Sequence, residues 1–179
     1  SDVAAGTTNV DRAVAIGYAA MGNANVTADG DGTIAIGYTA LLALTSGQYN
    51  VALGYEALVS LATGDDNIAI GYAAMDSANG SEFTNIAIGS NALGNMDNNS
   101  SGQNIAIGKN AGDGIGSIIS TNNIFMGVDA GGGTWTTATC DANIGIGNFA
   151  LDDAMNGAIY DIAIGHHALG GITTGDYNI

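Results

Sequence analysis

Acidic residues in predicted loops are the first candidates for chemistry in this chain. Asp29 and Asp31 stand in the stretch ADGDGT, which matches the D-x-D-G opening of a calcium-binding loop. Counted from Asp29, the twelfth position is Ala40, so the bidentate Glu that completes an EF-hand is missing. Asp65 and Asp66 form a second acidic pair, and carboxylates stacked on neighbouring coils would recruit a cation. We keep a structural calcium ion as an alternative and predict no other cofactor.

Aromatic residues are the candidates for surface contact. A tyrosine follows the glycine of a repeated motif four times in succession, at Tyr18, Tyr38, Tyr55 and Tyr72. Stacked as a ladder, these rings would pack loops together or offer their faces to sugar rings. Trp135 stands alone in the loop GGGTWTTATC. A tryptophan among Gly and Thr has little core to join, so we predict that it is an exposed contact residue.

Nucleophiles and general bases are too few and too scattered to indicate an enzyme. The two histidines, His166 and His167, are adjacent. On a strand or at its corner, neighbouring side chains point in opposite directions, so we do not expect them to hold one ion together. Cys140 has no cation nearby in sequence that would lower the pKa of its thiol. Neither a G-x-S-x-G elbow nor a phosphate-binding loop occurs, and we predict no catalysis.

The charge of the chain restricts its partners. Seventeen carboxylates face two basic residues, Arg12 and Lys109, which gives a formal net charge of −15. Binding to nucleic acid requires clustered Lys and Arg, so we exclude nucleic acid as a partner. No apolar run has the length of a membrane-spanning helix, and we predict no membrane insertion. The acidity also keeps an apolar scaffold soluble.

The elements that position these residues follow from an internal repeat, x-Ile-Ala-Ile-Gly. Its glycine recurs every 17 to 20 residues, at Gly17, Gly37, Gly54, Gly71, Gly89, Gly108, Gly127, Gly147 and Gly165. Helical repeats lose register when the period changes, whereas a β-solenoid absorbs extra residues in its corner loops. We therefore predict an all-β chain, with residues 1–179 forming one parallel β-solenoid domain (a β-roll) of about nine coils.

Each motif predicts a short strand, because β-branched residues alternate with period two. We expect the two Ile positions of each strand to face the interior and to stack into aliphatic columns that form the core. The asparagines just before the strands are expected to form amide ladders. These are Asn50, Asn67, Asn85, Asn104, Asn123 and Asn143. The variable remainder of each coil is expected to form loops and a second short strand. A helical turn in GYTALLALTSG and GYEALVSLATG is the alternative.

The residue between the two Ile positions decides how the solenoid assembles. It is small and apolar along almost the whole chain, and we predict that it lines a homotrimer interface at Ala35, Ala52, Ala69, Ala87, Ala106 and Ala163. An outward face exposed to water would normally carry polar residues. The alternative is that these alanines face water or a loop of the same chain. Phe125 departs from the pattern, and its bulk would either fill a gap left by Gly145 or mark a local widening of the coil.

The sequence NIAIGYxAL followed by TTGxxN resembles the repeats of phage tail fibres. The strand is also similar to the Val-Ala-Ile-Gly strand in the head of trimeric autotransporter adhesins. The resemblance covers residues 10–179. Adhesin heads have a shorter and more regular period, so this chain is closer to the tail-fibre pattern. Both families imply intertwined trimers that project outward and touch another cell, and neither implies catalysis.

We therefore expect a structural fibre or appendage protein, on a virion or an outer cell surface. It would hold a receptor-binding tip and adhere to a host-surface receptor or glycan. The final residues GDYNI read as the start of another NIAIG, so we expect a segment of a longer fibre. An adhesin head or an extracellular filament subunit is the alternative. A calcium-stabilised, ice-binding or surface-binding monomer is a second, although ice binding needs regular Thr-x-Thr rows that this sequence lacks.

Overall fold

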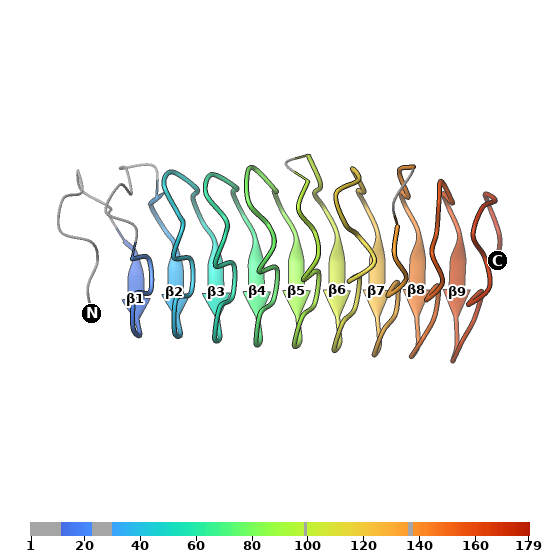
Figure 1. Cartoon of the computed structure of the whole chain (residues 1–179), viewed down its shortest axis with the longest axis horizontal. Helices are drawn as coiled ribbons and strands as arrows, with labels where there is room; N and C mark the ends of the chain where they lie inside the picture. The colour runs from blue at the N-terminus through green and yellow to red at the C-terminus, as the bar shows by residue number, and fades with distance from the viewer. Residues whose placement is uncertain (1–11, 23–29, 99, 136–137) are drawn as a thin grey trace.

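The protein is a β-solenoid in a computed structural model that describes residues 12–22, 30–98, 100–135 and 138–179. Within these ranges, nine three-residue strands form one parallel sheet in chain order (Figure 1). They are β1 (Val14–Ile16), β2 (Ile34–Ile36), β3 (Val51–Leu53), β4 (Ile68–Ile70), β5 (Ile86–Ile88), β6 (Ile105–Ile107), β7 (Ile124–Met126), β8 (Ile144–Ile146) and β9 (Ile162–Ile164). The chain coils between successive strands for about eight turns, which confirms the predicted fold class.

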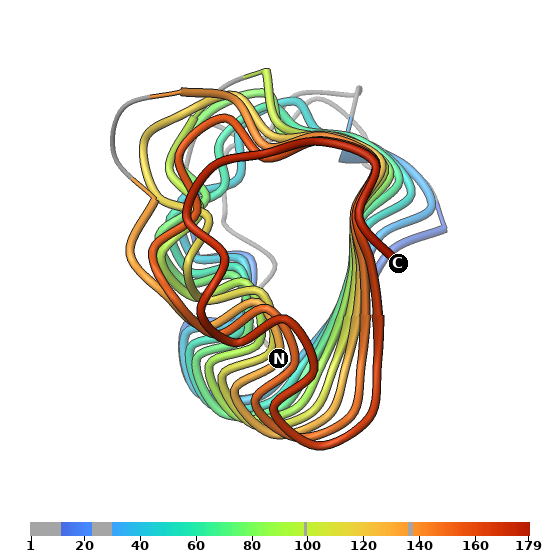
Figure 2. The ribbon, with the colours of Figure 1, turned by 90° about the vertical axis from the view of Figure 1, so that its right-hand side faces the viewer.

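Equivalent residues of successive coils stack directly on one another. Ala35 pairs with Ala52, for example, and no pair of strands is shifted in register. Seen along the rod, the coils superpose closely on the strand side and diverge on the opposite side (Figure 2). Each coil is therefore the template for the next, which explains why the chain repeats the same motif.

The side of the strands that faces the interior is the opposite of the predicted one. The middle residue of every strand is buried: Ala15, Ala35, Ala52, Ala69, Ala87, Ala106, Phe125, Gly145 and Ala163. The aliphatic residues flanking it are half-buried or exposed, up to 69% exposed for Ile164. The predicted aliphatic columns exist, because the strands stack in register, but they lie on the outside. Their assignment to the core is wrong.

The turn that follows each strand supplies the large side chains of the core. Leu41, Leu44, Leu58 and Leu61 are fully buried in two such turns. A coil of this length encloses little more than one layer of large side chains, and a close-packed interior leaves room for only a methyl group on the facing strand. The alanine three residues after the motif glycine is buried in eight coils, including Ala40, whereas Ala168 in the last coil is half-buried.

These turns are not helical. Thr39 and Leu41 have positive φ angles of 49° and 51°, whereas Ala40 between them does not, so the chain alternates between two conformations. The amide of Thr39 donates to Tyr18 O at 2.8 Å, and that of Leu41 donates to Ala57 O at 3.0 Å. The amide of Thr39 thus bonds to the preceding coil, and the amide of Leu41 bonds to the following coil. The described residues include no α-helix, and the expected second strand is reduced to isolated bridges.

The glycines of the first eight motifs form a column in which an added Cβ would overlap the backbone of the next coil. Gly71 has a φ of 139°, a value that L-residues rarely adopt. A Cβ built there would lie 2.5 Å from the carbonyl oxygen of Gly89 in the next coil. The glycine is thus required both by the corner and by the close approach of the coils.

The predicted asparagine ladder is confirmed and runs beside the strands. Asn67 donates from both its backbone amide (3.0 Å) and Nδ2 (3.1 Å) to Asn50 Oδ1, and Nδ2 also reaches Glu82 O at 2.8 Å. Asp161 takes the same place after β8. Its Oδ1 accepts two bonds from Asn178, but its buried Oδ2 has no partner in the described part of the chain. A carboxylate cannot donate, so the side-chain donation is lost at this point, while the backbone amide of Asp161 still donates to Asn143 Oδ1 at 2.9 Å.

Phe125 is accommodated by glycines in three coils. A Cβ added at Gly112, Gly131 or Gly145 would lie 3.2, 2.6 or 3.2 Å from its ring. Gly145 was expected to leave such a gap. Gly112 and Gly131 stand where other coils have Leu or Met, so the phenylalanine fills space that those side chains occupy elsewhere.

Candidate functional site

The outer side of the sheet is a continuous apolar surface, which we call the aliphatic face. It consists of the first and third residues of all nine strands, none of which is charged. Val14, Ile16, Leu53, Met126 and Ile146 are between 36% and 56% exposed, and most of the others are half-buried. The outer face of a sheet in water normally carries polar residues, so this uncharged strip is the candidate for an interaction surface.

The predicted interface of small residues is wrong. Ala35, Ala52, Ala69, Ala87 and Ala106 are 0% exposed, and Ala163 is 1% exposed. They contact the core of their own coil and are unable to meet another chain. The alternative prediction, that these alanines lie against another segment of the same chain, is the correct one. The prediction placed the wrong face of each strand inside. Because side chains alternate with period two, this single error exchanges every buried position of a strand with an exposed one.

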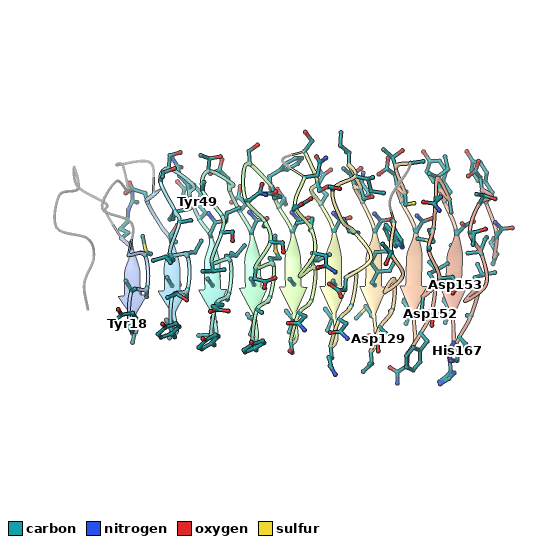
Figure 3. All side chains as sticks on the ribbon, in the orientation of Figure 1. Tyr18, Tyr49, Asp129, Asp152, Asp153 and His167 are labelled. Carbon is teal, nitrogen blue, oxygen red and sulfur yellow. The ribbon has the colours of Figure 1, made fainter. Side chains whose placement is uncertain are left out.

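The tyrosine ladder forms as predicted at the edge below the strands. Tyr18, Tyr38, Tyr55 and Tyr72 are stacked with ring centroids 4.9 to 5.4 Å apart. All four are exposed, and Figure 3 shows Tyr18 at the end of the row. The faces of the inner rings are covered by their neighbours, so the ladder presents ring edges and hydroxyl groups rather than platforms for sugar rings. Glu56 raises the pKa of Tyr55 by its negative charge.

Trp135 is a core residue, and its predicted exposure is wrong. The side chain is 1% exposed and packs edge-on against Phe125, with ring centroids 5.5 Å apart. The glycines around it leave the interior of these coils open enough for two large aromatic rings. Its indole Nε1 has no hydrogen-bond partner among the residues that the structure describes.

The predicted acidic residues do not gather into a metal site. Asp29 lies outside the described residues. Asp31 lies 3.9 Å from Arg12, and Asp65 accepts a hydrogen bond from the amide of Gln48 at 2.8 Å. Asp65 and Asp66 are both exposed in a corner loop. Over the described ranges, no group of three or more His, Cys, Asp or Glu is placed to hold an ion.

The two histidines and the cysteine lie in different environments. His166 and His167 are exposed, and their ring centroids lie 4.5 Å apart. Their side chains were expected to point in opposite directions, so the rings are closer together than predicted. His167 stacks on Phe149 and lies 3.6 Å from Asp152, near the edge shown in Figure 3. Burial raises the pKa of the Cys140 thiol, which disfavours the reactive thiolate.

A polar groove, which the sequence analysis missed, crosses the turns after β4 to β7. One cavity of about 240 Å³ is lined by Asp76, Ser77, Asn91, Gly94, Asn95 and Asp113. An adjoining cavity of about 280 Å³ shares Asn95 and Asp113 and adds Asp97, Gly114, Gly116, Ser117, Thr134 and Trp135. We call the two together the axial groove, because they cross successive coils along the rod.

The axial groove follows from an alternation along the chain. The fifth residue after the motif glycine is Asp76, Gly94, Asp113, Gly132 and Asp152 in five successive coils. Carboxylates on alternate coils are separated by about 10 Å, which reduces their repulsion, and the glycines between them leave space. Desolvation raises the pKa of both Asp76 and Asp113. Aligning the coils on the motif glycine reveals this row in the sequence alone.

Comparison of the chain with protein-family models, curated proteins and solved structures finds no match. In the described part of the chain, no helix has the length and apolar character needed to cross a membrane. The functional argument therefore depends on the surfaces of the solenoid itself.

Proposed function

We propose that this chain is the shaft segment of an extracellular fibre, on a virion or a cell surface, in which three copies pack together through the aliphatic face. The fibre would hold a receptor-binding tip away from its base and adhere to a host-surface receptor or glycan. The exposure of this uncharged face on a chain of net charge −15 is the observation that carries the proposal.

The dimensions of the aliphatic face suit a shared axis. At strand spacing, nine strands extend for about 38 Å, and three residues span about 10 Å across the strip. Three copies that turn this strip toward one axis would bury on the order of 400 Å² on each chain, about 1,200 Å² for the whole trimer, so the strip supplies the apolar centre of the interface and not its full area. The strip is continuous because the strands pair without a shift, so it is available along its whole length to the same strip on a parallel copy.

Charge also favours this arrangement over association through another side. The carboxylates within the described residues belong to turns and loops and not to the strands. Copies that meet through the aliphatic face therefore keep most of their negative charges on the outside, where water and salt screen them. The resemblance to tail fibres and to trimeric adhesin heads supports a trimer rather than a dimer, and an adhesin head or a filament subunit would use the same face.

The test is the mass in solution of the chain and of two charged variants, measured by light scattering. We expect about three times the 17.7 kDa of one chain, with no change on adding EDTA. Ile70→Glu with Ile107→Glu places two charges on the aliphatic face and should give a folded monomer. Glutamates at the exposed corner residues Ser100 and Gln103 are the control and should leave the assembly intact.

Two outcomes separate this proposal from the alternatives. A wild-type monomer, or equal masses for both variants, would contradict the interface. A loss of circular dichroism on adding EDTA would instead support the calcium-stabilised monomer. Ala69→Glu is expected to unfold the chain rather than dissociate it, because Ala69 is fully buried within its own coil.

A further inference from the structure

We propose that the tyrosine ladder is a site of oxidative cross-linking, at which carbon–carbon bonds between neighbouring rings join successive coils covalently. Each link connects two rungs of one chain, so this inference goes beyond the proposed fibre and does not depend on its oligomeric state. The chain has one cysteine, Cys140, and therefore no disulfide of its own that would join its coils.

The side chains that are most readily oxidised are divided between the inside and the outside of the solenoid. Trp135, Cys140 and four of the five methionines are at most 1% exposed, and only Met126 reaches the surface, at 38%. All seven tyrosines are exposed, between 44% and 72%. Susceptibility to oxidation follows exposure, so a one-electron oxidant in solution meets the phenol rings before the indole or the thiol.

Six of the seven tyrosines are stacked on another tyrosine. Besides the four rungs of the ladder, Tyr160 and Tyr177 have ring centroids 5.0 Å apart and an interplanar angle of 18°. Tyr49 is the exception within the described residues. Its ring lies over Gly32, where an added Cβ would be 2.6 Å from the ring. All but one of the exposed phenols therefore have a neighbouring phenol with which to couple.

The rungs of the ladder are parallel, and the backbone holds them in register. Neighbouring rings are 4.9 to 5.4 Å apart and inclined by only 10° to 13°. The amide of Glu56 donates to Tyr38 O and that of Ala73 donates to Tyr55 O, both at 2.9 Å, which fixes one tyrosine over the next. Rings held this close react with each other in preference to rings of another molecule. Their exposed tips leave room for the tilt that a bond between them requires.

Glu56 supplies a proton acceptor at the centre of the ladder. Its negative charge raises the pKa of the Tyr55 phenol, and its carboxylate accepts a hydrogen bond from the Tyr55 hydroxyl. The phenol keeps its proton at neutral pH, and a phenol that loses an electron has to release that proton. A carboxylate in hydrogen-bond contact takes the proton directly, which favours oxidation at this rung.

Each link removes two electrons and two protons from a pair of tyrosines. Each phenol loses one electron and one proton, and the two radicals join through their Cε atoms. Both rings then return to phenols as the hydrogen on each joined carbon leaves and a proton is taken up by each oxygen. The oxidant is a peroxidase with hydrogen peroxide, which accepts the two electrons and two protons and yields two water molecules.

The test treats the whole chain with a haem peroxidase and hydrogen peroxide. We expect the blue fluorescence of dityrosine in the single-chain band of a denaturing gel, and a mass lower by two hydrogen atoms for each link. The midpoint of thermal unfolding should rise by about 5 °C or more, because each link closes a loop of one coil in the unfolded chain.

Two variants locate the links. Tyr38→Phe with Tyr55→Phe keeps the stacked rings but leaves no two adjacent phenols in the ladder. It should lower the single-chain yield of dityrosine about 3-fold, because of three links only the one between Tyr160 and Tyr177 remains. The control, Tyr49→Phe, removes the unstacked tyrosine and should leave the yield unchanged.

A second pair of variants tests the proton acceptor. Glu56→Gln keeps the size of the side chain but removes the carboxylate, and it should slow the formation of dityrosine about 2-fold or more. Asp66→Asn removes an equal charge from an exposed corner loop and should leave the rate unchanged. Equal rates for these two variants would overturn the role of Glu56.

Four results would overturn the cross-linking proposal: no dityrosine, links only between chains, an equal loss of yield for the ladder variant and Tyr49→Phe, or an unchanged thermal midpoint. Repeating the reaction on the Ile70→Glu, Ile107→Glu variant separates this site from the fibre proposal. Links should form there in the same yield whether the protein is a trimer or a monomer, so failure of either proposal is recognised independently of the other.

Discussion

The coils of β2 to β4 and those of β6 to β8 have the same backbone arrangement. They differ in the side chains that fill the interior and line the edge. The first group has buried leucines or methionine in its turns and tyrosines stacked along its edge. The second group has Phe125 and Trp135 inside, glycines in place of leucine in the turns after β6 and β7, and the larger cavity of the axial groove. Both groups keep the motif glycine and the ladder position before the strand. The comparison shows that these two backbone-contacting positions specify the coil, while other positions change together in compensating sets.

The largest effect is expected where both groups depend on the same residue. Gly71→Ala places a Cβ against the carbonyl of Gly89 and forces an L-residue to a φ of 139°. We expect a loss of roughly 4 kcal/mol or more in the free energy of unfolding, from strain and overlap together. Urea denaturation at fixed protein concentration measures it. Gly171→Ala is the control, since nothing lies within 4 Å of its added Cβ, and an equal loss there would contradict the account.

The compensating set around Phe125 is tested by converting the second group toward the first. Phe125→Ala should lower the free energy of unfolding by about 3–4 kcal/mol, because it leaves a cavity beside three glycines. Adding Gly112→Leu and Gly131→Leu restores the residue type of the other coils and should recover a large part of that loss. Leu93 has a φ of 51° at the equivalent place, so leucine is compatible with the backbone there.

Thermal melts of the single and triple variants decide between coupled and independent positions. If the two leucines destabilise the Phe125→Ala chain further, the glycines have a role other than making room for the ring.

A smaller gain is expected from repairing the ladder after β8. Asp161→Asn supplies the Nδ2 donor that six other coils use to reach a corner carbonyl, at 2.7 to 3.3 Å. We expect a stabilisation of about 1 kcal/mol, because a buried atom without a partner gains one. The reverse change, Asn123→Asp, should destabilise the chain. Calorimetry of both proteins tests this, and equal signs for the two changes would contradict the ladder argument.

The smallest effect concerns Asp113 of the second group. Desolvation raises the pKa of Asp113 in the folded chain, so protonation favours folding. The contribution of Asp113 to stability is therefore present below its unfolded pKa of about 3.8 and is lost as pH rises through its folded pKa. Asp113→Asn should raise the melting temperature slightly at pH 7 and reduce its decline between acidic and neutral pH. A lower melting temperature for this variant would mean that the carboxylate supports the fold.

Much of the fold was predictable from the sequence, because identical residues stack on one another in successive coils and therefore recur at regular intervals in the sequence. The strands, the parallel order, the glycine corners, the amide ladder and the row of Tyr18, Tyr38, Tyr55 and Tyr72 all follow from equivalent positions in successive coils. The acidic row of Asp76 and Asp113 was visible in the same alignment and was missed, since its alternation appears only when every second coil is compared.

The direction of the strand faces was not predictable from periodicity alone. A period of two indicates that Ile68 and Ile70 lie on one face of the strand and Ala69 on the other, but it does not indicate which face is buried. Hydrophobicity favours Ile for the core, and the structure places Ala there because Leu and Met from the turns already fill the narrow coil. The burial of Trp135 has the same origin, since the space that it occupies is created by glycines and Phe125 from other coils.

The sequence by itself determined the repeat, the strands and their register, because these depend on local backbone preferences and on identical neighbours. Only the tertiary structure decided which residues form the core, which form the aliphatic face, and where the axial groove opens. Those properties depend on the volume enclosed by each coil, which is shared between residues of adjacent coils and is therefore invisible in any one of them.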